Sequence, residues 1–300
     1  MFRVSVLIVG LLWVTLAQAL VLPIPQGKNN VVGGMQRAYI EPGDTVSTVA
    51  RRYDMGALEL LLANPKLRLN QVLKTWDKVL IPSAFIIPDV PHQGIVINLA
   101  ELRLYYFPPG RPIVLTYPLG IGKEGWETPL GATEVLSKKE EPEWRVPESI
   151  RFYLLEEKGI QLPEVVPPGP ENPLGHYAMR LALSGYLIHG TNNPSSIGLR
   201  SSSGCIRLYP EDIQQLFSQV RPGTKVTIIH EPYKLGWNNN KLYIEAHDPL
   251  PDYETFQFYD SNLSDRIDSI VNQQTQINRS YVQMAIKGHV GYPQLIGQGV

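Results

Sequence analysis

The sequence predicts a multi-domain, mostly-β protein: a small β-α-α-β unit, a larger sandwich- or barrel-like domain, and a C-terminal extension with one helix. Three observations support this. The chain has 300 residues, enough for one large or two modest domains. Hydrophobic residues make up 43% of it, which permits a packed core. Its 25 glycines and 26 prolines favour loops and β structure over a helical bundle.

The first 19 residues have the pattern of a signal peptide. Arg3 supplies a positive start, Val4 to Leu16 are apolar, and Ala17-Gln18-Ala19 matches the site that signal peptidase cleaves. The alternative is an uncleaved anchor, but the apolar stretch of about 13 residues is short of the roughly 20 that a membrane span needs. We therefore expect cleavage after Ala19, export, and no stable membrane span in the mature chain. Residues 20–37 are predicted to be a flexible lead-in.

Residues 38–83 are predicted to form the β-α-α-β unit, with Asp44 or Thr45 capping the first helix. The stretches "PGDT", "VARRY", "LLLANP" and "VLIP" resemble the LysM module over its whole length. The resemblance implies binding of N-acetylglucosamine-containing glycans such as peptidoglycan. Trp76-Asp77 departs from the module, because a glycine is common there. The alternative is a small α/β domain without a ligand.

The rest of the chain divides into three stretches. Residues 84–93, with two prolines, are predicted to be a linker. Residues 94–230 contain many strand-like runs, including a hairpin around Leu99-Ala100-Glu101, and one firm helix that starts at Pro210. In the extension, residues 231–300, apolar residues recur every three to four positions, which predicts an amphipathic helix over roughly 262–286. Gln274 interrupts this stripe.

Cys205 is the only cysteine of the chain. Exported proteins usually use cysteines in pairs, so an unpaired thiol indicates either deep burial or chemistry. His189 ends the apolar strand "GYLIHG", 16 residues earlier, and imidazole is a suitable base for activating a thiol. Gly204 removes side-chain bulk beside the sulfur, and the backbone N–H groups around Gly204 and Cys205 are candidate oxyanion donors. Alone, the pair is a weak signal, and a purely structural role is the alternative.

The flanking residues strengthen the catalytic interpretation. "HGTNNPSSIGLRSSSGCIRLYPEDI" resembles the signature of the YkuD-type L,D-transpeptidases, and "TPLGATEV" and "NPLGHYAMRL" extend the resemblance over about residues 94–230. With a LysM-like unit ahead, the chain is similar to periplasmic enzymes that attach an outer-membrane lipoprotein to peptidoglycan. Ser203 stands where many members carry a histidine. The base of the family is the earlier histidine, His189, so this substitution affects only the tuning of the thiolate.

The resemblance implies an acyl transfer in two steps. Cys205 attacks the peptide bond before the terminal D-Ala of a tetrapeptide stem, and an amine of a lipoprotein lysine or of diaminopimelate then resolves the thioester. The carbonyl of Gly190 orients the imidazole, as a carboxylate does in other triads. Arg207 is a candidate for binding a substrate carboxylate, with a loop-bracing ion pair as the alternative. Ser203, Tyr177 and Arg200 are weaker candidates for substrate contact.

Other functions are less well supported. The net charge of −1 gives no footprint for nucleic acid. The remaining histidines show no metal-ligand spacing, and no cofactor is expected. Two alternatives stay open: an L,D-carboxypeptidase, with water as the acceptor, and a non-catalytic peptidoglycan-binding protein. The acyl acceptor, the oligomeric state and the role of residues 231–300 do not follow from the sequence.

Overall fold

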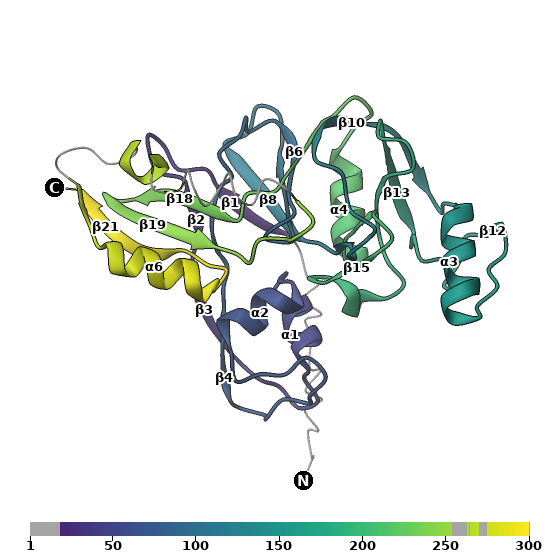
Figure 1. Ribbon diagram of the computed structural model, residues 1–300, viewed down its shortest axis with the longest axis horizontal. Helices are drawn as coiled ribbons and strands as arrows, with labels where there is room; N and C mark the ends of the chain where they lie inside the picture. Colours follow the sequence, from purple (N-terminus) through teal and green to yellow (C-terminus); the bar gives the residue numbers. More distant parts are fainter. Residues whose placement is uncertain (1–18, 254–262, 264, 270–274, 300) are drawn as a thin grey trace, which may run out of the picture.

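The computed structural model describes residues 19–253, 263, 265–269 and 275–299. The predicted signal peptide lies, except for Ala19, outside the described residues. Figure 1 shows a central β-rich body, a β-α-α-β unit below it, and a C-terminal sheet with helix α6 beside it. Within the described residues, no helix is both long enough and apolar enough to cross a membrane.

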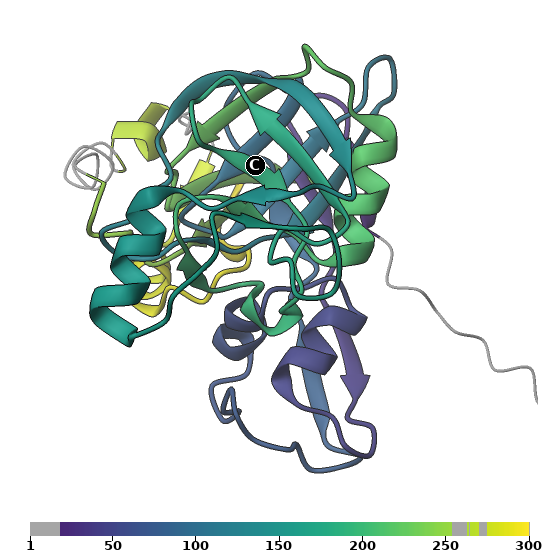
Figure 2. The same cartoon turned by 90° about the vertical axis from the view of Figure 1, so that its right-hand side faces the viewer.

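The body is built on a nine-stranded sheet with the order β1-β8-β7-β6-β17-β10-β13-β14-β16. Neighbouring strands are antiparallel, except for the parallel pairs β6–β17 and β14–β16. The sheet curls (Figure 2), and its strands contribute Ile, Leu and Val side chains to one buried core. Its strands are β1 (Leu20–Pro23), β6 (Gly94–Asn98), β7 (Arg103–Phe107), β8 (Ile113–Pro118), β10 (Gly131–Glu140), β13 (Tyr177–Leu181), β14 (Leu187–His189), β16 (Ile206–Arg207) and β17 (Lys225–Ile229).

Two sequence predictions for this body are confirmed. Strands β6 and β7 form the expected antiparallel hairpin. Helix α4 (Pro210–Gln219) begins with its proline in the first turn, and Ile213 and Leu216 are fully buried in the core. The smaller elements of the body are β9 (Ile121–Gly122), β11 (Trp144–Arg145), α3 (Glu148–Lys158), β12 (Val165–Val166), the 3-10 helix η1 (Pro194–Ser196) and β15 (Arg200–Ser202).

The predicted lead-in and linker are both ordered, contrary to expectation. In the lead-in, β1 joins the edge of the central sheet beside β8. Strand β2 (Val31–Gly33) pairs with β5 (Ala84–Ile86), which lies in the predicted linker and is fully buried. The apolar side chains of these segments explain the order, because Leu20, Leu22 and Phe85 pack into a shared core.

The β-α-α-β unit has the predicted element order: β3 (Gln36–Tyr39), α1 (Val46–Arg52), α2 (Ala57–Ala63) and β4 (Lys78–Ile81). Strands β3 and β4 pair antiparallel. Thr45 caps α1, as one of the two expected alternatives, through a reciprocal hydrogen bond with Thr48. Trp76 has φ +70°, which explains why glycine suits this turn.

The C-terminal extension is a second sheet, not a long helix. Its strands β18 (Tyr233–Asn238), β19 (Lys241–Ala246), β21 (Gln294–Gly299) and β20 (Thr275–Ile277) carry the helix α6 (Arg279–Gly288). The predicted helix over 262–286 is wrong, because β20 interrupts it. Leu263 and Ile267 are buried, as the stripe required, but Tyr281 and Met284 are exposed.

A buried ionic cluster joins this second sheet to the body. The Lys234 ammonium lies 2.6 Å from a carboxylate oxygen of Glu101 and 2.8 Å from one of Glu245. Glu245 also accepts a hydrogen bond from the backbone N–H of Ile86, at 2.6 Å. The extension is therefore anchored to the β6–β7 hairpin and to β5 by charges removed from water, whose loss would be costly.

Candidate active site

The parallel pairing of β14 with β16 brings the two predicted catalytic residues together. In this register His189 lies opposite Arg207 and Ile188 lies opposite Ile206. Side chains alternate along a strand, so Cys205 and Arg207 point to one side and Ile206 to the other. Ile188 and Ile206 are fully buried in the core, whereas His189, Cys205 and Arg207 line a common cavity of about 660 Å³.

His189 is held in its neutral form. Its Nδ1 lies 2.7 Å from the carbonyl oxygen of Gly190, the contact expected from the sequence. A protonated Nδ1 donates to this carbonyl and leaves Nε2 as the proton acceptor. Burial, with a smaller effect of the nearby Arg207 charge, lowers the pKa of His189 to about 3. The imidazole is therefore unprotonated at neutral pH.

The Cys205 thiol is also favoured in its neutral form. Burial raises its pKa, while a backbone hydrogen bond from Leu187 and the charge of Arg207 act in the opposite direction. Its sulfur lies 3.7 Å from the carbonyl oxygen of Gly185, as a thiol donor would. Burial thus disfavours a resting thiolate–imidazolium pair, and the proton would leave the sulfur as the reaction begins.

The loop before Cys205 is braced by two buried hydroxyl groups. Ser202 donates to the carbonyl oxygen of Cys205 at 2.6 Å and accepts the N–H of Gly204 at 3.1 Å. Thr128 donates to the carbonyl oxygen of Gly204 at 2.7 Å. The Gly204 N–H therefore already has an acceptor in Ser202, and the oxyanion-donor role of the backbone around Gly204 and Cys205 stays a prediction. Sequence reasoning missed Thr128, which lies 76 positions before Gly204, although it belongs to a motif quoted for the family resemblance.

Glycine at position 204 has a conformational reason. Its φ is +101°, and an added Cβ would lie 3.1 Å from the Cε1 atom of Tyr186. Any other residue would strain the turn and press against the ring. Gly204 therefore presents the sulfur through backbone geometry, because its N–H is already engaged.

Arg207 lies inside the cavity with its charge uncompensated by an ion pair. Within the described residues it contacts no carboxylate, and its Nε is buried without a hydrogen-bond partner. Burial lowers its pKa, with an opposite contribution from Cys205. The loop-bracing ion pair considered from the sequence is absent among these residues, which leaves the guanidinium available for an anion.

Of the three weaker candidates for substrate contact, only one lies in the cavity. Ser203 lines the cavity, but Tyr177 and Arg200 are not among its lining residues. Tyr177 packs against Phe217 with ring centroids 4.9 Å apart, and Arg200 is ion-paired with Asp252. Both side chains are engaged in packing or pairing, so they stabilise structure around the site.

The cavity contains further basic residues that sequence reasoning did not single out. Four of them line its wall: Lys123, Arg145, Lys158 and Arg180. The wall also includes one carboxylate, Glu143, which pairs with Arg145 at 2.9 Å. Positive charge therefore exceeds negative charge in the lining, even after this pair is discounted.

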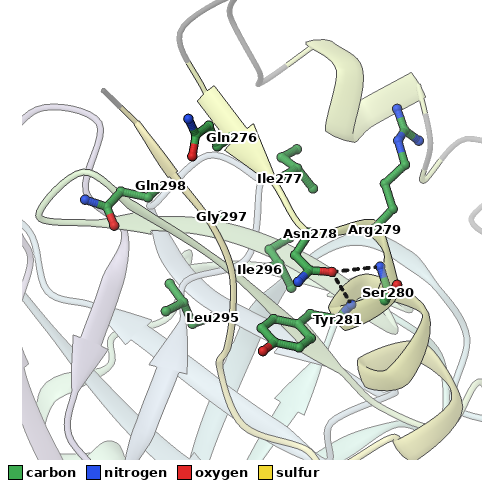
Figure 3. A pocket seen from close by; sticks show the side chains of 10 residues that line it. All are labelled: Gln276, Ile277, Asn278, Arg279, Ser280, Tyr281, Leu295, Ile296, Gly297 and Gln298. Atoms are coloured by element: carbon green, nitrogen blue, oxygen red, sulfur yellow. Dashed lines mark hydrogen bonds between the residues drawn. The ribbon is translucent and has the colours of Figure 1, made fainter.

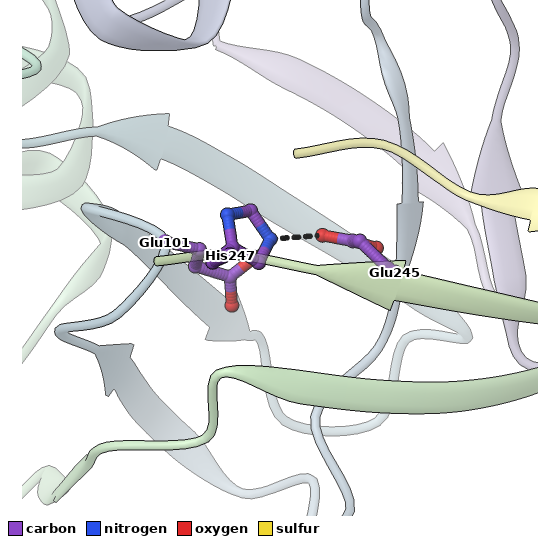
Figure 4. A group of neighbouring side chains, drawn as sticks. All are labelled: Glu101, Glu245 and His247. Carbon is purple, nitrogen blue, oxygen red and sulfur yellow. Dashed lines mark hydrogen bonds and ion pairs between the residues drawn. The ribbon is translucent and has the colours of Figure 1, made fainter. Parts of the chain in front are cut away.

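Two other clusters are less suited to catalysis. A hollow between β20, α6 and β21 is lined by Arg279 and by amide, hydroxyl and apolar groups, with no cysteine, histidine or carboxylate in its lining (Figure 3). Glu101, Glu245 and His247 lie close enough to hold a cation (Figure 4). However, the Lys234 ammonium contacts both carboxylates and supplies that positive charge. This cluster is a structural ion network.

The protein thus has a mostly-β domain with a cysteine and a histidine in the lining of one cavity. This arrangement is typical of enzymes that use a cysteine together with a histidine. Residues 92–228 match the L,D-transpeptidase catalytic domain family, YkuD. The chain belongs to the L,D-transpeptidase family and is an enzyme of that class.

The relatives cover much of the chain. YcfS of Escherichia coli strain K12, described as a probable L,D-transpeptidase, is 45% identical over 240 residues, 78% of this chain and 74% of YcfS. YbiS of the same strain, described likewise, is 37% identical over 302 residues, 98% of this chain and 96% of YbiS. The solved catalytic domain of an E. faecium L,D-transpeptidase is 23% identical, with a TM-score of 0.37, over 47% of this chain and 100% of that one. Family membership rests on the sequence relatives.

Proposed function

We propose that the protein is a periplasmic L,D-transpeptidase, exported by its signal peptide, that acts on the tetrapeptide stems of peptidoglycan. The observation that carries this proposal is the shared cavity: a thiol, a neutral imidazole and an unpaired arginine lie on one wall, with an excess of basic side chains around it. Stem peptides carry several carboxylates, and a basic cavity attracts them. Arg207 would bind the terminal carboxylate of D-Ala through its planar guanidinium.

The first step transfers the acyl group to the enzyme. Nε2 of His189 takes the thiol proton as the Cys205 sulfur bonds to the carbonyl carbon before D-Ala. The C–N bond then breaks, the D-Ala amine takes that proton from the imidazolium, and a thioester remains. The Gly190 carbonyl favours the imidazolium through its hydrogen bond with Nδ1.

The second step returns the enzyme to its starting state. An amine attacks the thioester carbon and loses its proton to His189. The C–S bond breaks, and the sulfur regains a proton from the imidazolium. The acceptor we propose is a lysine of an outer-membrane lipoprotein or the side-chain amine of another diaminopimelate residue, which would give a 3-3 cross-link.

We further propose that residues 38–83 act as a LysM module that holds glycan strands. Trp76, in the turn before β4, is 73% exposed. An exposed ring of this kind can stack on a sugar. Helix α1 is fixed to the body by a two-point pairing of Arg51 with Glu211, at 2.7 and 2.8 Å, so bound glycan and active site would keep a constant separation.

The test is a reaction with disaccharide-tetrapeptide, followed by mass spectrometry. We expect release of D-Ala and, with a lipoprotein C-terminal peptide or a second stem added, a new amide to its amine. Cys205→Ala should abolish release and leave glycan binding unchanged. Cys205→Ser should also fail, because an alcohol is harder to deprotonate. D-Ala release without any amide product would instead indicate a carboxypeptidase, and no release would indicate a non-catalytic binding protein.

A further inference from the structure

Two buried carboxyl groups lie behind the active-site strand with unsatisfied hydrogen-bonding capacity. Asp54 follows α1, and Asp212 lies in the first turn of α4; they are 2% and 1% exposed. Within the described residues, one oxygen of Asp54, both oxygens of Asp212 and the hydroxyl of Tyr117 have no conventional donor as a partner, and the two carboxyl groups contact each other as a hydrogen-bonded pair. One shared proton satisfies only part of this capacity, and leaving buried polar groups unpaired is costly, so the pair has room for a further donor or a cation.

The charge of Arg103 favours the ionised form of both carboxyl groups, but neither neighbouring arginine is their own ion-pair partner. Arg103 makes two hydrogen bonds of 2.8 Å to Glu59, and Arg51 is paired in the same way with Glu211. Each arginine is thus already balanced by one glutamate. Burial raises the pKa of Asp54 to about 7, and burial together with the charge of Asp54 raises that of Asp212 well above its usual range. A proton shared between the two carboxyl groups would relieve their repulsion, but it would still leave one negative charge without a cation of its own.

The backbone N–H of Leu20 already contacts Asp54, one member of this pair. Its N–H donates to the second oxygen of Asp54 at 3.0 Å. The preceding residue, Ala19, is itself buried, and its N–H lies 3.2 Å from the side-chain oxygen of Gln215 on α4. Leu20 is also the residue that signal peptidase is expected to expose, because the small-x-small site ends at Ala19.

We propose that the Asp54–Asp212 pair is a binding site for the α-ammonium group of the mature chain, created when cleavage after Ala19 frees Leu20. Hydrolysis consumes one water: Ala19 leaves as a carboxylate and Leu20 gains a protonated amine. The single amide N–H becomes three donors with a positive charge. One donor keeps the contact with Asp54, and the others can reach Asp212 and the Gln215 oxygen that Ala19 vacates.

The consequence is that export would complete the packing of the enzyme. The uncleaved chain carries an amide against the two carboxyl groups, whereas the mature chain carries a matched cation. The site joins β1, the β-α-α-β unit and α4, the helix that starts three residues after Arg207. The inference rests on the export proposed above, but it does not depend on the reaction or on which acyl acceptor the enzyme uses.

The test combines two N-terminal forms of the folded chain with one substitution, Asp212→Asn, in a four-member cycle. One form begins with a free amine at Leu20; the other begins with Nα-acetyl-Ala19 and keeps the amide geometry. Each is made with and without the substitution. We expect the free-amine form to melt roughly 3–6 °C higher. Asp212→Asn should lower the melting temperature of that form, and raise or leave unchanged that of the acetyl form.

A second measurement does not depend on variants. Acetylation of the Leu20 amine by an N-hydroxysuccinimide ester at pH 7 should be at least about tenfold slower in folded than in unfolded protein, because an ion-paired ammonium is a poor nucleophile. Three results would each overturn the proposal: equal effects of Asp212→Asn in both forms, equal acetylation rates, or exported protein whose first residue is not Leu20. None of these results bears on D-Ala release, so the enzymatic proposal is tested separately.

Discussion

Replacing Ser202 by alanine should disturb the nucleophile more than any other one-atom change near it. The hydroxyl holds the Gly204 N–H at 3.1 Å and the Cys205 carbonyl at 2.6 Å, and Ser202 is 2% exposed. Its removal leaves both backbone groups without that partner, each at a cost of about 1–3 kcal/mol when buried. Because the contact with the Cys205 carbonyl is only partly buried, we expect a total loss of about 2–3 kcal/mol.

The assay pairs stability with reactivity. Urea unfolding should report that loss of free energy, and the rate of D-Ala release should fall at least about tenfold with little change in KM, because binding groups such as Arg207 stay in place. Ser203→Ala is the matched control, since Ser203 lines the same cavity one residue further on but has no brace to lose. If both variants behave alike in stability and turnover, the hydroxyl does not position the thiol.

Three further predictions concern the turn at Gly204, the ion cluster around Lys234 and the protonation of the Cys205 thiol. Gly204→Ala should slow alkylation of Cys205 beyond the effect of Gly131→Ala, which has a similar positive φ but open space around its Cβ; equal rates would contradict the steric argument. Lys234→Met should cost about 3–5 kcal/mol in urea unfolding, because two buried carboxylates lose their cation; a loss no larger than that of Lys241→Met, at an exposed position of β19, would refute it. Burial lowers the pKa of His189 to about 3 and raises that of Cys205, so alkylation should rise with pH up to at least the thiol's ordinary value of 9.0. A plateau near neutral pH would reveal a resting ion pair.

The sequence predicted those elements whose formation depends on residues close together in the chain. The hairpin β6–β7, the cap of α1 and the proline start of α4 each depend on residues within a few positions. Helix α3 was not predicted, because none of its residues is buried in a core. Its apolar residues Ile150, Tyr153 and Leu154 line the cavity instead, and Phe152 and Leu155 are exposed. The prediction of one long C-terminal helix failed because apolar spacing continues from the helical residues 265–269 into α6 and does not reveal β20 between them.

For the site, the sequence predicted the thiol and the imidazole but not the hydrogen bonds that hold the loop around them. Cys205 and His189 belong to one motif, and a parallel strand pair joins them. Thr128 reaches the same loop from 76 positions before Gly204, and no local spacing shows that contact. The hydrogen bond from the Gly204 N–H to the Ser202 hydroxyl was also not predicted, because the residue pattern does not show which backbone donor a neighbouring hydroxyl accepts from.

Contacts between distant residues also explain why the predicted lead-in and linker are ordered. Each apparent boundary is crossed by polar groups buried between parts: Ile86 meets Glu245 of the second sheet, and Leu20 meets Asp54 of the β-α-α-β unit. Composition shifts mark where local patterns change, but they do not record which distant carboxylate a backbone N–H will find. Because these contacts involve carboxyl groups that are themselves buried, breaking one costs more than an exposed linker contact would. The three parts should therefore unfold together, and separating them at the composition boundaries would expose unpaired carboxylates on both sides.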